Sequence, residues 1–152
     1  MCAEKFQPAL AIHPGEEADL AALAENGWCV LDPAVVAPTP HAYQRFIQGS
    51  KAEFGIAKSG YVHSRSGWFS DRSACYLASG RPVIAQETGF SRELPVGEGL
   101  FAFATMEEIL AAIEAMNTDY ARHARAARGL AEEFFDSRTV LARLLNEVGA
   151  AA

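Results

Sequence analysis

The chain has 152 residues, of which 50% are hydrophobic and 21% charged, and its formal net charge is -6. That length suits a single domain with its own hydrophobic core, and the negative charge disfavours nucleic acid as the main partner. No apolar run approaches the ~20 residues that a membrane-spanning helix needs, and residues 1–10 lack the layout of a signal peptide, so we expect a cytoplasmic protein.

The beginning of the chain is predicted to be loosely organised. Residues 1–15 form a lead-in, within which 6–12 is either an edge strand or an unanchored segment, because Pro8 cannot donate a ladder hydrogen bond. Apolar residues at helical spacing predict a helix over 16–26. A short apolar stretch, 28–31, then predicts a strand.

Three signals organise the next stretch. Thr39 is suited to cap a helix and Pro40 to occupy its first position. The buried side of this helix is expected to consist of Tyr43, Phe46 and Ile47. Residues 54–57 predict the next strand, which leads into the loop Lys58-Ser59-Gly60-Tyr61 at the carboxyl edge of the predicted sheet.

The centre of the chain predicts a helix followed by a strand. Ser70 is a suitable N-cap, and Asp71 would be stabilised by the helix dipole. Gly80 fits the left-handed position that ends a helix, and Pro82 prevents the helix from resuming. Residues 82–85 are short and apolar, as in a strand buried on both faces. The helix face on the sheet is expected to consist of Ala74, Cys75, Leu77 and Ala78.

The C-terminal part predicts one more strand and three helices. The strand covers 100–103, and Thr105 with Glu108 has the spacing of a capping box that opens the first helix. The second helix covers 119–134, with its arginines on the solvated side. The third covers 137–149 and has an apolar stripe of Val140, Leu141, Leu144, Leu145 and Val148. Strands alternating with helices predict an α/β fold with a doubly wound parallel sheet, in one domain over 1–152.

The best candidate for an anion site is the N-terminus of the helix that Ser70 caps. Its free backbone amides, the positive end of its dipole and the hydroxyls of Ser70 and Ser73 suit a phosphate. Arg72 or Lys58 would supply positive charge. The plainer alternative is that Ser70 and Asp71 only cap a structural helix.

Two neighbouring segments add candidate contacts. Trp68 and Phe69 either stack on a base or sugar or cover the core. Glu87-Thr88-Gly89 follows the predicted central strand and offers a carboxylate, a hydroxyl and a glycine that permits close approach. The same residue types also form ordinary turns.

Metal and thiol chemistry are not expected. Neither the 4 histidines nor the 3 cysteines have the spacing of zinc ligands, and the odd number of widely spaced cysteines favours reduced thiols. Cys75 is expected to be an inert thiol buried in its helix face. We therefore expect no metal and no other cofactor.

A family resemblance carries these expectations further. The segment from Phe54 to Gly89 resembles the C-terminal, donor-binding half of GT-B fold glycosyltransferases, above all in Leu77-Ala78-Ser79-Gly80-Arg81-Pro82-Val83-Ile84. The string Ser66-Gly67-Trp68-Phe69-Ser70-Asp71-Arg72-Ser73 is similar to bacterial members of the group-1 and spore-maturation-protein type. The resemblance extends from about Gly27 through the terminal helices.

This resemblance implies a Rossmann-like domain that binds a nucleotide-diphosphate sugar, with the diphosphate at 70–73 and the sugar near 86–89. The candidate donor-binding residues are Lys58, Gly67, Trp68, Phe69, Ser70, Asp71, Arg72, Ser73, Gln86, Glu87, Thr88 and Gly89. Many retaining members carry a pair of glutamates where this chain has Gly67 and Cys75. The usual carboxylate contact to the donor ribose is therefore missing or moved to Asp71 or Glu87, and no catalytic residue is assigned.

A GT-B enzyme closes two Rossmann-like halves around its reaction centre, and this chain holds only one. We therefore expect hexosyl transfer only in combination with an N-terminal, acceptor-binding half, and no transfer by the isolated chain. The alternative is a non-catalytic Rossmann-like binding or assembly module that has lost glycosyltransferase activity; a small flavodoxin-like domain for another anionic ligand is a third interpretation. The expected partners are a nucleotide-sugar and, through 137–149, either the missing half or a second copy of this chain.

Overall fold

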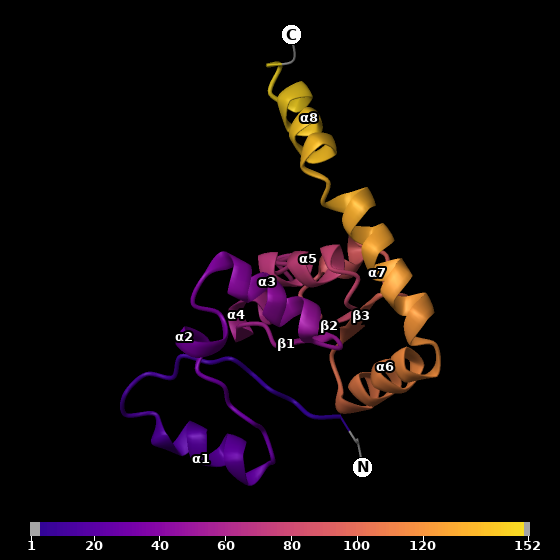
Figure 1. Ribbon diagram of the computed structural model, residues 1–152. Coiled ribbons are helices and arrows are strands. Elements are labelled where there is room, and N and C mark those ends of the chain that lie inside the picture. Colours follow the sequence, from indigo (N-terminus) through magenta and orange to yellow (C-terminus); the bar gives the residue numbers. More distant parts are fainter. Residues whose placement is uncertain (1–3, 151–152) are drawn as a thin grey trace. The chain divides into compact units, whose positions relative to one another are not determined.

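The computed structural model describes residues 4–150, and the chain divides into two compact units between Gly49 and Ser50. Figure 1 shows the helices and strands of both units, which we describe separately. Over residues 4–150, every helix is too short or too polar to cross a membrane.

The regular secondary structure of the first unit is helical. Its helices are α1 (Glu17–Glu25), α2 (Pro33–Val36) and α3 (Pro40–Gly49). The predictions of α1 and α3 are confirmed, and Thr39 Oγ1 accepts a hydrogen bond from the Ala42 amide at 3.2 Å, as expected of a cap. Of the three residues expected on the inner side of α3, Ile47 is buried, whereas Tyr43 and Phe46 are half-buried.

The strand predicted over 28–31 is wrong. The described residues there form a single parallel bridge, between Ala9 and Leu31, and a few backbone hydrogen bonds to the lead-in segment. Pro8 lacks an amide, so a regular ladder cannot continue through this pairing. The stretch 6–12 is therefore an extended lead-in with one bridge.

The short helix α2 was not predicted, because Asp32-Pro33 directly follows the predicted strand over 28–31 and is also typical of the end of a strand. The Asp32 carboxylate accepts a hydrogen bond from the Ala34 amide at 2.8 Å, and Pro33 occupies the first helical position. Both features are typical of a helix start.

The second unit is built on a sheet of three parallel strands in the order β1 (Glu53–Gly55), β2 (Val83–Gln86) and β3 (Leu100–Phe103). Phe54 lies opposite Ile84, and Ile84 opposite Phe101. Val83, Ile84 and Ala85 are buried, as predicted for a strand covered on both faces. The unit is a mixed α/β structure, and three strands are too few to define a doubly wound sheet.

Within residues 50–150, five helices and one 3-10 turn complete the second unit: α4 (Ser59–Ser64), α5 (Asp71–Ala78), η1 (Phe90–Arg92), α6 (Met106–Thr118), α7 (Tyr120–Phe134) and α8 (Ser137–Glu147). α5 contacts β1 and β2 and packs alongside α7, while α6 contacts β3. α4 and η1 were not predicted, and the other four helices agree with the sequence. None of the residues of α8 is buried.

The helix ends follow the predicted local signals. After α5, Gly80 has a φ of +64° and the Arg81 amide donates to the Tyr76 carbonyl at 2.9 Å, which is a Schellman motif. Thr105 and Glu108 form the expected reciprocal capping box at the start of α6.

The buried face of α5 differs from the prediction. Its buried residues are Ser73, Tyr76 and Leu77, whereas Cys75 and Ala78 are exposed. Positions three and four apart share a helix face, so the large Tyr76 and Leu77 side chains set which face turns inward. The small residues do not.

Candidate functional site

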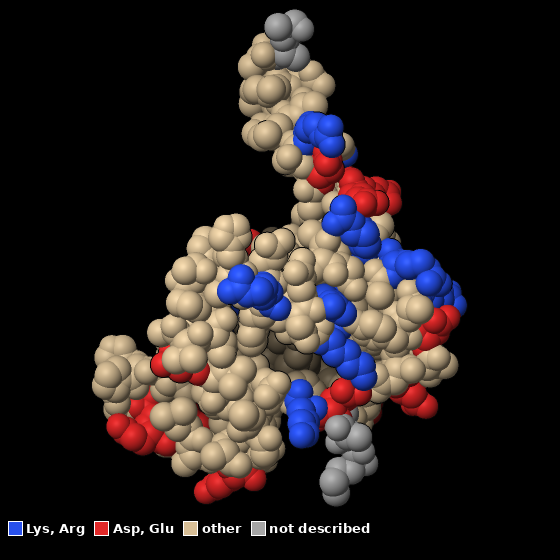
Figure 2. All heavy atoms as spheres, in the orientation of Figure 1, with Lys and Arg blue, Asp and Glu red and all other residues tan. Residues whose placement is uncertain are grey.

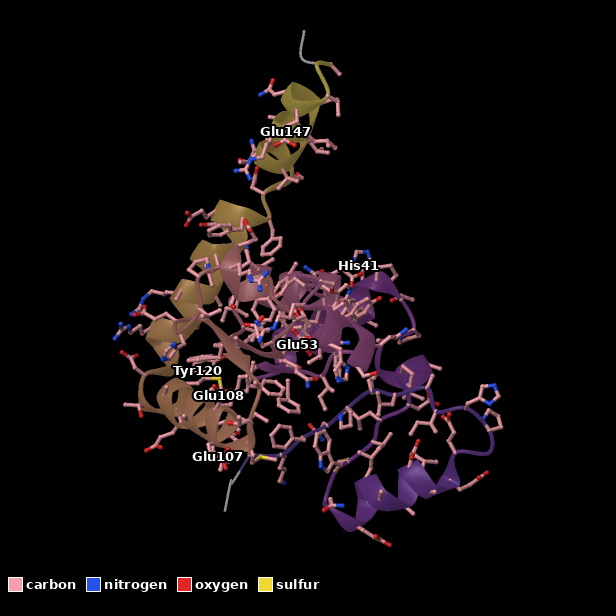
Figure 3. The ribbon with its side chains drawn as sticks, turned by 180° about the vertical axis from the view of Figure 1, so that it is seen from behind. His41, Glu53, Glu107, Glu108, Tyr120 and Glu147 are labelled. Atoms are coloured by element: carbon pink, nitrogen blue, oxygen red, sulfur yellow. The ribbon has the colours of Figure 1, made fainter. Side chains whose placement is uncertain are left out.

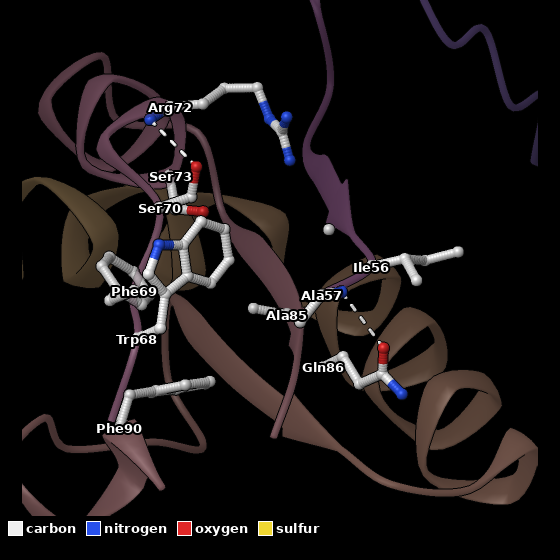
Figure 4. Close-up of a pocket in the computed structure, with 11 residues that line it drawn as sticks. Ile56, Ala57, Trp68, Phe69, Ser70, Arg72, Ser73, Ala85, Gln86 and Phe90 are labelled. Atoms are coloured by element: carbon white, nitrogen blue, oxygen red, sulfur yellow. Dashed lines mark hydrogen bonds between the residues drawn. The ribbon is translucent and has the colours of Figure 1, made fainter. Parts of the chain in front are cut away.

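A shallow pocket with a cavity volume of about 10 Å³ lies where β1 and β2 end and α5 begins (Figure 4). It is lined by Gly55, Ile56, Ala57, Trp68, Phe69, Ser70, Arg72, Ser73, Ala85, Gln86 and Phe90. Open α/β sheets bind ligands at the carboxyl ends of their strands. The pocket therefore lies at the edge where the sequence predicts a site.

The N-terminus of α5 contributes polar groups to this pocket. Ser70 Oγ accepts a hydrogen bond from the Arg72 amide at 3.2 Å, and Asp71 Oδ1 accepts one from the same amide at 2.9 Å. Within the described chain, the amides of Asp71 and Ser73 donate to no acceptor. These two amides and the positive end of the helix dipole suit an anion.

Arg72 lies between the pocket and a buried carboxylate. Its Nε donates to Glu53 Oε1 at 2.5 Å, and the side chains are 46% and 3% exposed respectively. Gly55 lies beside the pair, where a Cβ would be 3.7 Å from Arg72 Nη2. The second carboxylate oxygen, Glu53 Oε2, is buried and has no hydrogen-bond partner among the described residues. Figure 3 shows Glu53 within the body of the second unit.

The two aromatic residues of the predicted site have different environments. Phe69 packs against Phe90 and stacks on Phe135, with ring centroids 5.2 Å and 5.6 Å away. Trp68 is 38% exposed and stacks on Tyr61 of α4, with a centroid distance of 4.9 Å and an angle of 9° between the rings. Phe69 is therefore a packing residue, and Trp68 is the exposed ring at the pocket.

The loop after β2 is held by its own hydrogen bonds. The Thr88 hydroxyl donates to the Trp68 carbonyl at 2.5 Å, and the Gly67 amide donates to the Thr88 carbonyl at 2.8 Å. Glu87 Oε1 accepts from the Gly89 amide. These contacts join the loop after β2 to the segment that carries Trp68, and so position its ring.

Of the predicted site residues, the pocket brings together Trp68, Phe69, Ser70, Arg72, Ser73 and Gln86. Those that do not line it are Lys58, Gly67, Asp71, Glu87, Thr88 and Gly89. Lys58 is exposed and directly precedes α4. Gln86 Oε1 accepts a hydrogen bond from the Ala57 amide at 3.1 Å and thereby ties the end of β1 to β2.

Cys75 is exposed, so the prediction of a buried thiol is wrong, because Tyr76 and Leu77 turn inward instead. Partial burial raises the pKa of the Cys75 thiol, and the negative charges of Asp71 and Glu53 raise it further. The thiolate is therefore disfavoured. Over residues 4–150, no three side chains of metal-binding type lie together as a possible metal site.

The arginines of α7 lie on its solvated side, as predicted, and Figure 2 shows basic side chains along this part of the second unit. Arg122 forms an ion pair with Glu98, and Arg128 Nε lies 2.8 Å from Glu132 Oε1. All four side chains are more than half exposed, so these pairs contribute little to stability.

Sequence reasoning missed Glu53 and Tyr61. Glu53 directly precedes residues 54–57, which are predicted to form a strand, and an acidic residue at the start of a buried strand signals a possible partner elsewhere. Only the folded chain shows that this partner is Arg72. The sequence predicts Tyr61 in a loop, and the helix α4 that brings it to Trp68 has no strong sequence signal.

Comparisons of the chain with protein-family models, curated proteins and solved structures gave no match.

Proposed function

We propose that this chain is the donor-binding domain of a glycosyltransferase and holds a nucleotide-diphosphate sugar and its diphosphate leaving group. The observation that supports this proposal best is the pocket in which the first turn of α5, Arg72 and the exposed ring of Trp68 meet. An anion-binding helix terminus beside an aromatic surface suits a ligand that joins a diphosphate to a base.

In this proposal the amides of Asp71 and Ser73 bind the diphosphate, and the Ser70 hydroxyl and Arg72 assist them. Lys58 reaches the diphosphate from the exposed start of α4. Trp68 stacks on the base or the sugar. We include in the same proposal a Rossmann-like, doubly wound arrangement of the sheet. The domain transfers a hexosyl group only when an acceptor-binding half is also present. Electrostatic stabilisation of the leaving group is the contribution of this half.

A second candidate is a non-catalytic binding or assembly module, and the pocket itself favours it in two respects. Its cavity volume of about 10 Å³ is far below the roughly 300–1,000 Å³ of typical ligand sites. No carboxylate lines it, because Asp71 and Glu87 lie outside the lining and Glu53 is beneath Arg72, so a ribose would lack its usual acidic contact.

Thermal unfolding with UDP, GDP, ADP and their sugar conjugates separates the two candidates. A nucleotide at a hundred times its dissociation constant stabilises the fold by about 2.7 kcal/mol, which is several degrees in the midpoint for a domain of this size. We expect one base to give this shift, and Trp68→Ala to abolish it.

Trp28→Ala is the matched control, because Trp28 lies in the first unit and stacks on Phe6 rather than lining the pocket. No shift with any nucleotide would favour the second candidate. A shift that Trp68→Ala leaves unchanged would place the ligand elsewhere.

A further inference from the structure

The strongest unassigned surface is the apolar face of α8. Four of its side chains and that of the residue after it form this face, and all five are 46% to 64% exposed: Val140, Leu141, Leu144, Leu145 and Val148. Figure 1 shows α8 beyond the end of α7. An amphipathic helix of 11 residues is marginal in water without packing, so this face requires a partner.

The pattern of the helix defines the shape of this face. At 100° per residue, the apolar side chains fall within a sector of about 140°. Arg143 and Glu147 both lie on one flank of that sector, and Figure 3 shows Glu147 on α8. The described residues include no ion pair between Arg143 and Glu147, although they are four positions apart. An arginine N-terminal to a glutamate is the less favourable order for such a pair.

We propose that this face binds the same face of a second copy of the chain, with the two α8 helices antiparallel about a twofold axis. In a twofold interface each contact occurs twice: if residue i of one copy contacts residue j of the other, then residue j of the first copy contacts residue i of the second. With the axis between Leu144 and Leu145, Leu144 meets Leu145 of the second copy and Leu141 meets Val148. The apolar face is then complementary to itself.

The charged flank supports the antiparallel arrangement. Antiparallel helices place equivalent flanks together, so Arg143 of each copy meets Glu147 of the other and two ion pairs form. The register of the two helices that forms the ion pairs differs by no more than one residue from the register that forms the leucine contacts, so both sets of contacts are compatible. In a parallel, in-register pair this flank would face the opposite one, whose charged residue is Arg138. Arg138 is nine positions, or about 13 Å along the helix axis, from Glu147, so no ion pair would form. Flanking charges of this kind set helix orientation in coiled coils.

The dimer is expected to be weak. A standard interface has about 20–30 residues on each side, and this face supplies few. We therefore expect monomers at about 10 μM and substantial dimer towards about 1 mM, the affinity range of a transient interface. Sedimentation velocity over this range measures the association directly.

The first test removes the apolar contact. Leu144→Asp is expected to weaken dimerisation at least tenfold, while Leu110→Asp, on α6 and 47% exposed, leaves it unchanged. Thermal unfolding of both variants confirms that they fold. A chain that stays monomeric at about 1 mM, the weak end of the affinity range, or a dimer that Leu144→Asp does not weaken, would overturn the proposal. The apolar face of α8 would then bind a partner other than a second copy of the chain.

The second test addresses orientation. Arg143→Glu alone creates two glutamate pairs in its dimer, and Glu147→Arg alone creates two arginine pairs, so each variant is expected to dimerise less than the unchanged chain. An equimolar mixture of the two restores both ion pairs in a heterodimer. We expect the mixture to associate more strongly than either variant, and increasingly so as salt is lowered. A mixture that associates no better than its components would contradict the antiparallel register.

Discussion

Arg72 and Glu53 form an ion pair beside Gly55, with the guanidinium at the pocket and the carboxylate buried beneath it. The two partners differ in their access to water, because Glu53 is 3% exposed and Arg72 46%. Removing Arg72 and removing Glu53 are therefore expected to have different effects on stability. The arginine can be hydrated without its partner, whereas the glutamate cannot.

Arg72→Ala is expected to lower the free energy of unfolding by about 3 kcal/mol, because it leaves an uncompensated buried carboxylate. Glu53→Gln is expected to cost less than half of that, since the exposed guanidinium regains water. Urea unfolding measures both values. In the double variant, Glu53→Gln should recover part of the loss caused by Arg72→Ala, and strictly additive losses would show that the pair is not coupled.

The pair also affects how binding experiments at this site are designed. Replacing Ser70 and Arg72 together by alanine would remove a helix cap and one member of a buried pair. A loss of ligand binding would then reflect unfolding as well as lost contacts. Trp68→Ala and Lys58→Ala avoid this difficulty, because both side chains are exposed.

Gly99 is expected to be the most sensitive glycine of the second unit. A Cβ there would overlap the backbone of Ala127 in α7, and its φ is +74°. Gly99→Ala is therefore expected to cost more than about 3 kcal/mol. Gly97→Ala is the matched control, because Gly97 has a φ of +110° with open space around its Cβ position, and only the backbone cost of about 1 kcal/mol applies. Equal losses in the two variants would contradict the close approach of α7.

The Thr88 hydroxyl is expected to fix the position of Trp68. Thr88 is 1% exposed, and Thr88→Val leaves the Trp68 carbonyl without its donor, at a cost of about 1–3 kcal/mol. Tryptophan emission in a Trp28→Phe background reports on Trp68 alone. We expect a shifted emission maximum for Thr88→Val and an unchanged one for Thr88→Ser, which keeps the hydroxyl. The same spectrum for both would mean that the hydrogen bond does not hold the ring.

Cys75 is expected to react slowly with alkylating reagents despite its exposure. Its thiol pKa is raised by partial desolvation and by the charges of Asp71 and Glu53. A raised pKa leaves less thiolate at pH 8 than an ordinary cysteine has, so reaction should be slower than that of free cysteine and should accelerate at higher pH. Peptide mapping after brief alkylation measures the reaction at Cys75, and Asp71→Asn should increase its rate. A reaction at Cys75 that is faster than that of free cysteine would contradict this prediction.

Elements with signals in adjacent residues could be predicted from the sequence. The capping box of Thr105 and Glu108, the glycine after α5 and the cap at Ser70 all act within one helical turn, and the structure contains each of them. The short strands β2 and β3 were also predicted, because a short apolar run bounded by turns has few alternatives.

Features that depend on distant residues could not be predicted. The pairing of Glu53 with Arg72 joins positions 19 residues apart, and the stacking of Trp68 on Tyr61 requires α4. The inward face of α5 is decided by what Tyr76 contacts, including a hydroxyl contact of 3.4 Å with Ser50. Asp32-Pro33 is a different case, because its signal is local. It starts the helix α2, whereas the sequence predicts the end of a strand there.

The central position of β2 has a consequence for hydrogen exchange. It is paired on both sides, and Val83 and Ile84 within it are buried. Amides in such a strand exchange with deuterium only when the whole unit opens, whereas amides of a helix without buried residues, such as α1, exchange through local fraying. The exchange rates of β2 amides therefore report the global stability of the second unit in one undisturbed sample. A ligand that binds the native pocket stabilises the second unit against unfolding. It must therefore slow the exchange of the β2 amides by the same factor by which it lowers the unfolded fraction of the unit.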